Sequence, residues 1–183
     1  MLKKYSPPEK WILLGIPVLF LVGSMFHFLY EISGENLIIG TFAPVNESIW
    51  EHLKLVVLPI ICWWGIYYLT EGKNYNINKN PWFSGAISAL ITALITIPLG
   101  YYFYTGAFGI ELLAIDIALL LIAIFIGQVI GLHIYRHSNG IPVRLSILVM
   151  LGILVVFIIF TFNPPHLPMF LDTIGNQYGV IKY

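Results

Sequence analysis

The stretch LSILVMLGILVVFIIFTF, residues 145–162, carries no charged side chain and decides the class of fold. A helix of about 20 mostly apolar residues is what crosses the ~30 Å hydrocarbon core of a bilayer. The whole chain of 183 residues continues this character, with 58% hydrophobic and 10% charged residues and a mean hydropathy of +0.86. Soluble domains carry about 25% charged residues. We therefore predict an all-α, polytopic membrane helical bundle.

Five segments are long and apolar enough to form transmembrane helices. They lie at about residues 11–31, 49–70, 82–104, 108–135 and 142–162. Pro164 and Pro165 end the fifth span because proline cannot continue a helix. The first span lacks a small-x-small cleavage site, so we predict that it is retained. The chain is then one integral membrane domain, 1–183, with a polar tail over 163–183.

The distribution of lysine and arginine predicts the orientation. Short cytoplasmic loops are enriched in these residues. Seven of the nine fall on one side if the N-terminus is cytoplasmic: Lys3, Lys4, Lys10, Lys73, Lys79, Arg136 and Arg144. The N-terminus is therefore expected inside and the C-terminus outside. The net charge is zero and no basic stretch is present, which argues against nucleic acid as a partner.

This topology brings scarce polar residues to one depth, at the outer ends of different spans. They are His27, Glu31, Glu47, Glu51, His52, Asp116 and His166. Asp116 is the most informative of them, because a carboxylate inside a span costs at least about 2.5–3.5 kcal/mol unless it faces a partner or a cavity. It shares a helix face with Ala123 and Gly127, so it is expected to point into the bundle.

Each of these residues also has an ordinary structural explanation. Ser48 and Glu51 fit a helix capping box. His27 alone could bond a backbone carbonyl, Glu31 could simply be solvated, and His166 could be a loop residue. The coincidence of three histidines and several carboxylates at one depth favours a shared site.

Imidazole and carboxylate ligands together suit zinc or another divalent metal. We expect His27, His52 and Asp116 as first choices for ligands, with His166 as an alternative. Glu47 or Glu51 would be the acid–base group, and Glu31 would orient His27. The long connection over residues 32–48 could cover this site as a lid.

Three functions are compatible with such a site. The first is a metal-dependent hydrolase or transferase acting on a membrane lipid or another amphiphile. The second is a small transporter or substrate-binding membrane subunit, in which Asp116 couples proton movement. The third is a structural partner without chemistry, for which the histidines and acids would not converge.

Small residues predict where helices approach closely. Gly127 and Gly131 form a GxxxG pattern, which in membranes lets two helix backbones come together. A homodimer through the Gly127/Gly131 face is one expectation from this pattern. Cys62 is the only cysteine, so an intrachain disulfide is impossible.

The sequence HIYRH, with His133 and His137 four residues apart, resembles the HxxxH of membrane hydrolases that include alkaline ceramidases and the progestin and adiponectin receptors. That resemblance implies a site with Ser24, His27 and Asp116 at the matching positions. This chain departs from the family in having five spans rather than seven. The predicted topology also places HIYRH at the inner end, away from His27, so His133 and His137 are expected to contact headgroups instead.

Two further blocks, HFLYEISGENLIIGTFAPVNESIWEHLKL and NPPHLPMFLD with a later YGV, resemble an uncharacterised family of small multi-pass bacterial membrane proteins. This resemblance implies one compact helical domain in a bacterial cytoplasmic membrane. It implies no reaction.

Overall fold

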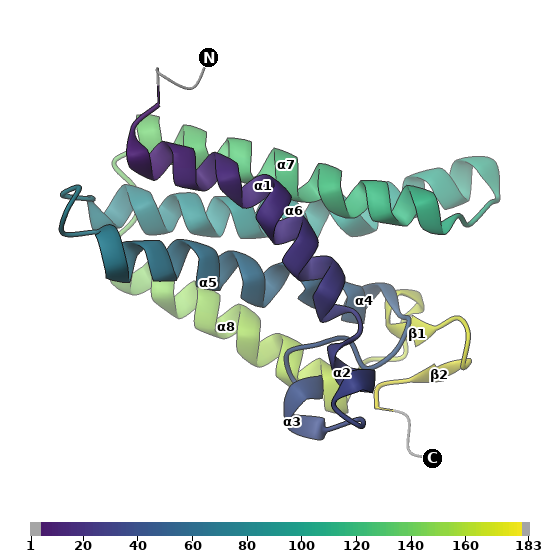
Figure 1. Ribbon diagram of the computed structural model, residues 1–183. Coiled ribbons are helices and arrows are strands. Elements are labelled where there is room, and N and C mark those ends of the chain that lie inside the picture. Colours follow the sequence, from purple (N-terminus) through teal and green to yellow (C-terminus); the bar gives the residue numbers. More distant parts are fainter. Residues whose placement is uncertain (1–4, 181–183) are drawn as a thin grey trace.

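The computed structural model describes residues 5–180, and five long apolar helices dominate it (Figure 1). Each is long and apolar enough to cross a membrane, so the predicted all-α fold is confirmed and each predicted span has a matching helix. The helices are α1 (Pro7–Phe26), α5 (Lys54–Glu71), α6 (Lys79–Phe108), α7 (Leu113–His137) and α8 (Val143–Phe162). The short helix α4 (Ile49–His52) leads directly into α5, and together they form the second span.

The smaller elements gather at one end of the bundle, where α1 ends and α5 begins (Figure 1). Two single-turn helices, α2 (Leu29–Ile32) and α3 (Leu37–Gly40), follow α1. The 3-10 turn η2 (Pro168–Phe170) follows α8 and leads into a two-stranded antiparallel hairpin. In this hairpin Leu171 of β1 (Leu171–Asp172) pairs with Tyr178 of β2 (Gln177–Tyr178).

Local chemistry sets the helix ends. Ser6 caps α1, and its backbone N–H donates to the Glu9 carboxylate over 2.6 Å in a capping box. Gly109 ends α6 in the left-handed conformation with φ +64, which glycine adopts without steric cost. The fifth span stops at Phe162, immediately before Asn163 and the predicted proline pair.

The first span differs from its predicted range of 11–31. The continuous helix stops at Phe26, and the chain turns at His27 and Phe28 before α2 begins. His27 and Glu31 therefore do not lie one turn apart on one continuous helix, as the sequence led us to expect. Hydropathy misses this break, because the residues on both sides of it are apolar or aromatic.

The long helices form three layers, with α1 and α7 on one side, α5 and α6 in the middle and α8 on the other side (Figure 1). The closest backbone approach joins α7 to α6. A Cβ atom at Gly127 would lie 2.6 Å from the carbonyl oxygen of Ala89, and one at Gly131 would lie 2.8 Å from that of Gly85. The GxxxG pattern is thus used within one chain. Homodimerisation stays a prediction, and its contact would need another face because α6 occupies this one.

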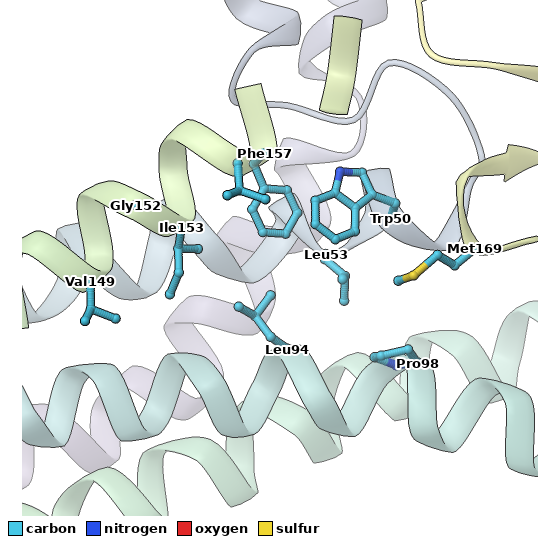
Figure 2. Close-up of a pocket in the computed structure, with 10 residues that line it drawn as sticks. Trp50, Leu53, Leu94, Pro98, Val149, Gly152, Ile153, Phe157 and Met169 are labelled. Carbon is cyan, nitrogen blue, oxygen red and sulfur yellow. The ribbon is translucent and has the colours of Figure 1, made fainter. Parts of the chain in front are cut away.

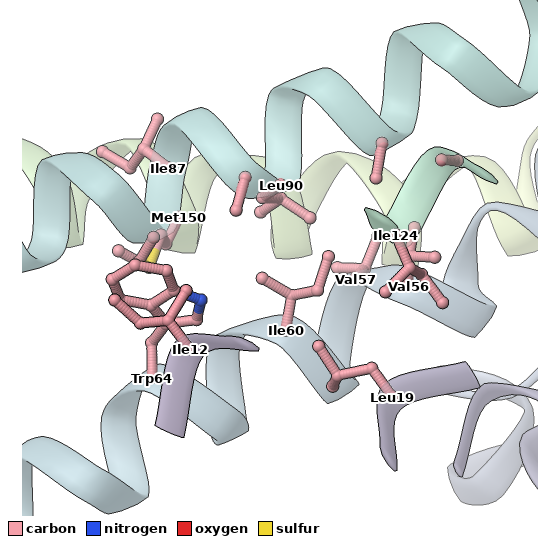
Figure 3. Close-up of a cluster of buried hydrophobic side chains, with 14 of the residues drawn as sticks. Ile12, Leu19, Val56, Val57, Ile60, Trp64, Ile87, Leu90, Ile124 and Met150 are labelled. Carbon is pink, nitrogen blue, oxygen red and sulfur yellow. The ribbon is translucent and has the colours of Figure 1, made fainter. Parts of the chain in front are cut away.

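The span that contains α5 has the largest buried share of the five, and its Val56, Ile60 and Trp64 meet side chains of the other four spans in the core (Figure 3). Two indoles fasten α1 to α5. The rings of Trp11 and Trp63 stack with centroids 4.0 Å apart, and each indole N–H donates to the other residue's carbonyl oxygen. In a membrane, close packing and such interhelical hydrogen bonds hold helices together, because lipid is as apolar as the helices are.

Candidate metal centre

Three side chains from three separate segments converge where α1 ends. His27 follows the last residue of α1, Glu47 lies in the loop before α4, and His52 is the last residue of α4. The two Nε2 atoms of the histidines are 3.2 Å apart. The Glu47 Oε2 atom lies 3.3 Å from Nε2 of His52 and 3.6 Å from Nε2 of His27. The predicted convergence of His27 and His52 is thus present, with Glu47 as the third member.

These distances match the edges of a metal coordination tetrahedron. Nitrogen and oxygen ligands bind zinc at about 2.0–2.2 Å, so two of them on one tetrahedral ion lie about 3.3–3.6 Å apart. The three observed separations of 3.2, 3.3 and 3.6 Å fall within or next to that interval. His27, Glu47 and His52 could therefore hold one ion with little rearrangement.

The His52 ring is fixed in the orientation that a metal ligand needs. Its Nδ1 atom lies 2.9 Å from the backbone carbonyl oxygen of Ser48. A carbonyl only accepts, so this contact places the proton on Nδ1 and leaves the lone pair of Nε2 directed at His27 and Glu47. Histidines that bind metals usually have such a partner on the other ring nitrogen. The sequence analysis did not assign this role to Ser48.

The loop that carries Glu47 is anchored by its neighbours. The buried Asn46 side chain donates to the carbonyl oxygen of Gly179 over 2.8 Å and accepts from the Ser48 backbone N–H over 2.9 Å. The Ser48 hydroxyl in turn caps α4 by accepting from the Glu51 N–H. The contact to Gly179 ties the loop to the C-terminal tail, 133 residues away in sequence.

Glu51 forms a buried ion pair. Its Oε2 atom lies 2.6 Å from Nζ of Lys54, and both side chains are only 2% exposed. The same oxygen accepts the backbone N–H of Val45, and the Thr161 hydroxyl of α8 lies 3.2 Å from Oε1. Both oxygens of Glu51 are thus engaged away from the His27–Glu47–His52 cluster. Half of the predicted capping box is present, because Ser48 caps Glu51 while the Glu51 carboxylate turns to Lys54 instead of back to Ser48.

Lys54 completes this anchor. Besides Glu51, its ammonium group donates to the carbonyl oxygens of Gly40 and Ala43, over 2.7 and 3.3 Å. The predicted lid over residues 32–48 is therefore fastened to the start of α5. Sequence reasoning placed Lys54 merely on the outer side. The available signal was its spacing of three residues from Glu51, which suits an ion pair on a helix.

Asp116, expected as a ligand, lies in the first turn of α7 and accepts a hydrogen bond of 2.7 Å from the Tyr104 hydroxyl of α6. Among the residues that the structure describes, it does not belong to the cluster whose ligand atoms lie within 4.8 Å of one another. It remains close enough for its charge to act on His52. Tyr104, which sequence reasoning did not select, sets the direction of this carboxylate.

The other two expected site residues lie apart from the cluster. His166 is exposed after α8, and its ring stacks on Tyr178 with centroids 4.6 Å apart. Glu31 is exposed on α2, beyond the turn that separates it from His27. His133 and His137 pair at the opposite end of the bundle, with ring centroids 4.8 Å apart. The Ser24 hydroxyl donates to the Phe20 carbonyl oxygen within α1.

The charge of the bundle end that carries the His27–Glu47–His52 cluster suits a cation. Among residues 5–180, its ionisable groups apart from histidine and tyrosine are seven acids and Lys54; the acids are Glu31, Glu35, Glu47, Glu51, Glu111, Asp116 and Asp172. Interaction first with the His27 ring and then with the His52 ring holds the pKa of the Glu47 carboxyl far below its ordinary value. Glu47 is therefore an anion throughout the physiological range, and its side chain is 42% exposed.

Comparisons with known proteins agree with the resemblance drawn from the sequence blocks and give no support to the resemblance to ceramidases and adiponectin receptors. No curated protein and no solved structure matches the chain. A family model matches residues 1–180 and is described only as a family of unknown function. The chain belongs to this family, DUF6512.

Proposed function

We propose that this protein is a metal-dependent hydrolase or transferase that acts on an amphiphile at the outer surface of a bacterial cytoplasmic membrane. The observation that carries the proposal is the set of three ligand atoms, two imidazole Nε2 atoms and one carboxylate oxygen, at tetrahedral separations. Zinc is the preferred ion. Ligands about 2.1 Å from an octahedral ion would lie about 3.0 Å apart, which is shorter than each of the three separations.

Three protein ligands leave a fourth position for water, as in catalytic zinc sites. All three side chains are partly exposed, so a substrate can reach this position from outside the bundle. A zinc ion held by His27, Glu47 and His52 would lower the pKa of a water in this position to about 7 and so would supply a nucleophile near neutral pH. Glu47 acts as a ligand in this scheme, and Glu51 and Lys54 position the loop that presents it.

Asp116 and Tyr104 belong to the surroundings of the metal. The carboxylate of Asp116 carries a negative charge near His52, and Tyr104 fixes its direction. We assign Asp116 the acid–base role that was expected of Glu47 or Glu51, because Glu47 is a ligand in this scheme and both oxygens of Glu51 are already engaged.

The orientation with the N-terminus in the cytoplasm is supported by charge. Apart from Lys54, the lysines and arginines of the described residues lie at the end opposite the cluster: Lys10, Lys73, Lys79, Arg136 and Arg144. This is the distribution that the positive-inside rule requires if the cluster is extracytoplasmic.

Transport is the competing function, with the same cluster as a proton or ligand site. Two cavities between the spans, of about 470 and 150 Å³, are lined by apolar side chains, so neither offers a polar path for a solute. Surface chemistry therefore fits the geometry better.

The first test is metal stoichiometry in purified protein, after chelation and reloading with zinc. We expect one zinc per chain, and we expect His27→Ala, His52→Ala and Glu47→Gln each to weaken binding at least tenfold. His166→Ala and His133→Ala are the matched controls, because both remove an exposed histidine outside the cluster. A wild-type protein that binds no zinc, or equal loss in the control variants, would refute the metal site.

The second test is turnover of ester and phosphoester amphiphiles by the loaded and the chelated protein. Hydrolysis that requires zinc and is abolished in His52→Ala would support the enzyme. The transporter would be favoured over the enzyme if zinc binds without turnover and the protein takes up a solute into proteoliposomes. Asp116→Asn should then abolish that uptake.

A further inference from the structure

The larger cavity is a groove of about 470 Å³ between α6 and α8 (Figure 2). Leu94 and Pro98 of α6 form one wall, and Val149, Ile153 and Phe157 of α8 form the other. At the end nearest the metal cluster, Trp50 of α4 lines it. Its volume is typical of pockets that bind small molecules, which range over about 300–1,000 Å³.

The groove has the length of one membrane leaflet. From Val149 to Phe157 the helix rises about 12 Å, close to half of the ~30 Å hydrocarbon core. The empty space between its walls, open side included, is about 850 Å³, which over that length gives a mean cross-section of about 70 Å², or a width of about 9.5 Å. A transmembrane helix measures about 10–12 Å across with its side chains. The groove is therefore too narrow for a partner helix and wide enough for a single hydrocarbon chain.

The protein's own side chains leave this space open. Gly152 lines the groove, and a Cβ atom added there would meet no atom within 4 Å. The outer end is closed by aromatic rings, because the Trp50 ring stacks on Phe157 with centroids 4.4 Å apart and lies tilted against Phe170 with centroids 4.7 Å apart. A hydrocarbon chain lying in the groove would end beneath the rings of Trp50, Phe157 and Phe170.

Helix α4 joins the groove to the metal cluster. Trp50 and His52 are two residues apart, so they project about 200° apart around this single turn. One side of α4 therefore lines the groove while the other side presents a metal ligand. An amphiphile whose chain fills the groove has its polar end at the level of α4, one helix width from the cluster.

We propose that this groove binds one hydrocarbon chain of an amphiphile from the outer leaflet and so selects long-chain substrates for the metal centre. The selection of substrates for the metal centre rests on the proposed function, whereas binding of the hydrocarbon chain in the groove does not. The binding site is the groove lined by Trp50, Leu94, Pro98, Gly152, Ile153 and Phe157.

The test uses the full-length protein in nanodiscs that contain a phosphatidylglycerol with a diazirine midway along one acyl chain. After photolysis, labelled peptides are mapped by mass spectrometry. We expect label concentrated on residues 94–98 and 149–157 in the wild-type protein. Gly152→Leu fills the groove and should lower this label at least fivefold. Gly65→Leu is the matched control, because Gly65 also faces open space but lines the smaller cavity.

Label spread evenly over all lipid-facing helices, or unchanged in Gly152→Leu, would overturn the proposal. So would a dimer, seen by mass photometry, that Gly152→Leu dissociates, because a second copy would then occupy the groove. The wild-type map decides the question even if Gly152→Leu fails to fold. Zinc stoichiometry in the same samples reports on the metal centre separately, so failure of one proposal is distinguishable from failure of the other.

Discussion

Replacing Glu51 by glutamine tests how the site is held together, because it removes one charge from a buried ion pair. Both partners are 2% exposed, and Lys54 would keep its charge with only neutral acceptors: the carbonyl oxygens of Gly40 and Ala43 and the amide oxygen of the new glutamine. Removing one partner of a buried pair costs about 3–5 kcal/mol, because the other charge is left uncompensated. For a chain of this size we expect the midpoint of thermal unfolding to fall by about 6–20 °C.

The assay is thermal unfolding in one detergent, followed by tryptophan fluorescence. Glu35→Gln is the matched control, because it makes the same change at an exposed position, and its midpoint should stay near that of the wild type. The double variant Glu51→Gln with Lys54→Met removes both charges. Because a buried pair can often be replaced by uncharged groups at little cost, it should recover at least 2 kcal/mol relative to Glu51→Gln.

The metal site gives an independent readout of the same change. Glu51 accepts the backbone N–H of Val45, two residues before Glu47. A neutral amide oxygen accepts this N–H more weakly than a carboxylate does, so zinc binding in Glu51→Gln should weaken while the ratio of one zinc per chain is kept. A Glu51→Gln variant that unfolds within 2 °C of the wild type, or a double variant less stable than the single one, would refute this account of the ion pair.

Three further outcomes follow from the geometry. The Glu47 carboxyl stays ionised, so protons compete with zinc only at the imidazoles, and free imidazoles in peptides titrate near 6.5. The dissociation constant for zinc, measured by chelator competition, should therefore rise about 10–100-fold between pH 7.5 and pH 5.5. Cobalt can replace zinc as an ion whose visible spectrum reports on its bound water. Asp116→Asn should keep full cobalt binding but lower the pKa of this water by about half a unit to one unit, because the negative charge that disfavours hydroxide is removed. Gly127→Leu should destabilise the bundle by about 1–3 kcal/mol or more, because its Cβ would lie 2.6 Å from the Ala89 carbonyl oxygen, whereas Gly106→Leu meets open space and should leave thermal unfolding unchanged.

Hydropathy and the depth of polar residues could predict the spans and part of the site. The apolar runs fix five helices, because about 20 apolar residues have no better environment than lipid. Adjacent spans run in opposite directions, so the end of the first and the start of the second must meet. This reasoning brought His27, Glu47 and His52 to one depth, and the structure brings them into contact.

The role of each side chain within the site could not be predicted in the same way. These roles depend on the direction in which each side chain points, which composition does not encode. Glu47 and Glu51 are four residues apart, yet one lies in the loop with the histidines while the other turns to Lys54. The turn at His27 is a second feature that composition does not encode. It removes Glu31 from the α1 axis and lets Tyr30 pack against Gly40, where a Cβ would lie 2.9 Å from the Tyr30 ring. No proline or glycine marks that turn in the sequence.

The acids near the His27–Glu47–His52 cluster support the proposal that it binds a cation. Glu51 is balanced by Lys54, Asp116 is bonded to Tyr104, and the buried Asp172 accepts a hydrogen bond from Ile174. Glu47 has only the two imidazoles beside it, and the lone pair of the His52 Nε2 atom is directed toward it. Two facing nitrogen atoms 3.2 Å apart need either a proton or a metal between them. A proton can bridge only one pair of the three atoms at a time, whereas one divalent ion satisfies all three, and the surplus of negative charge around them favours the ion.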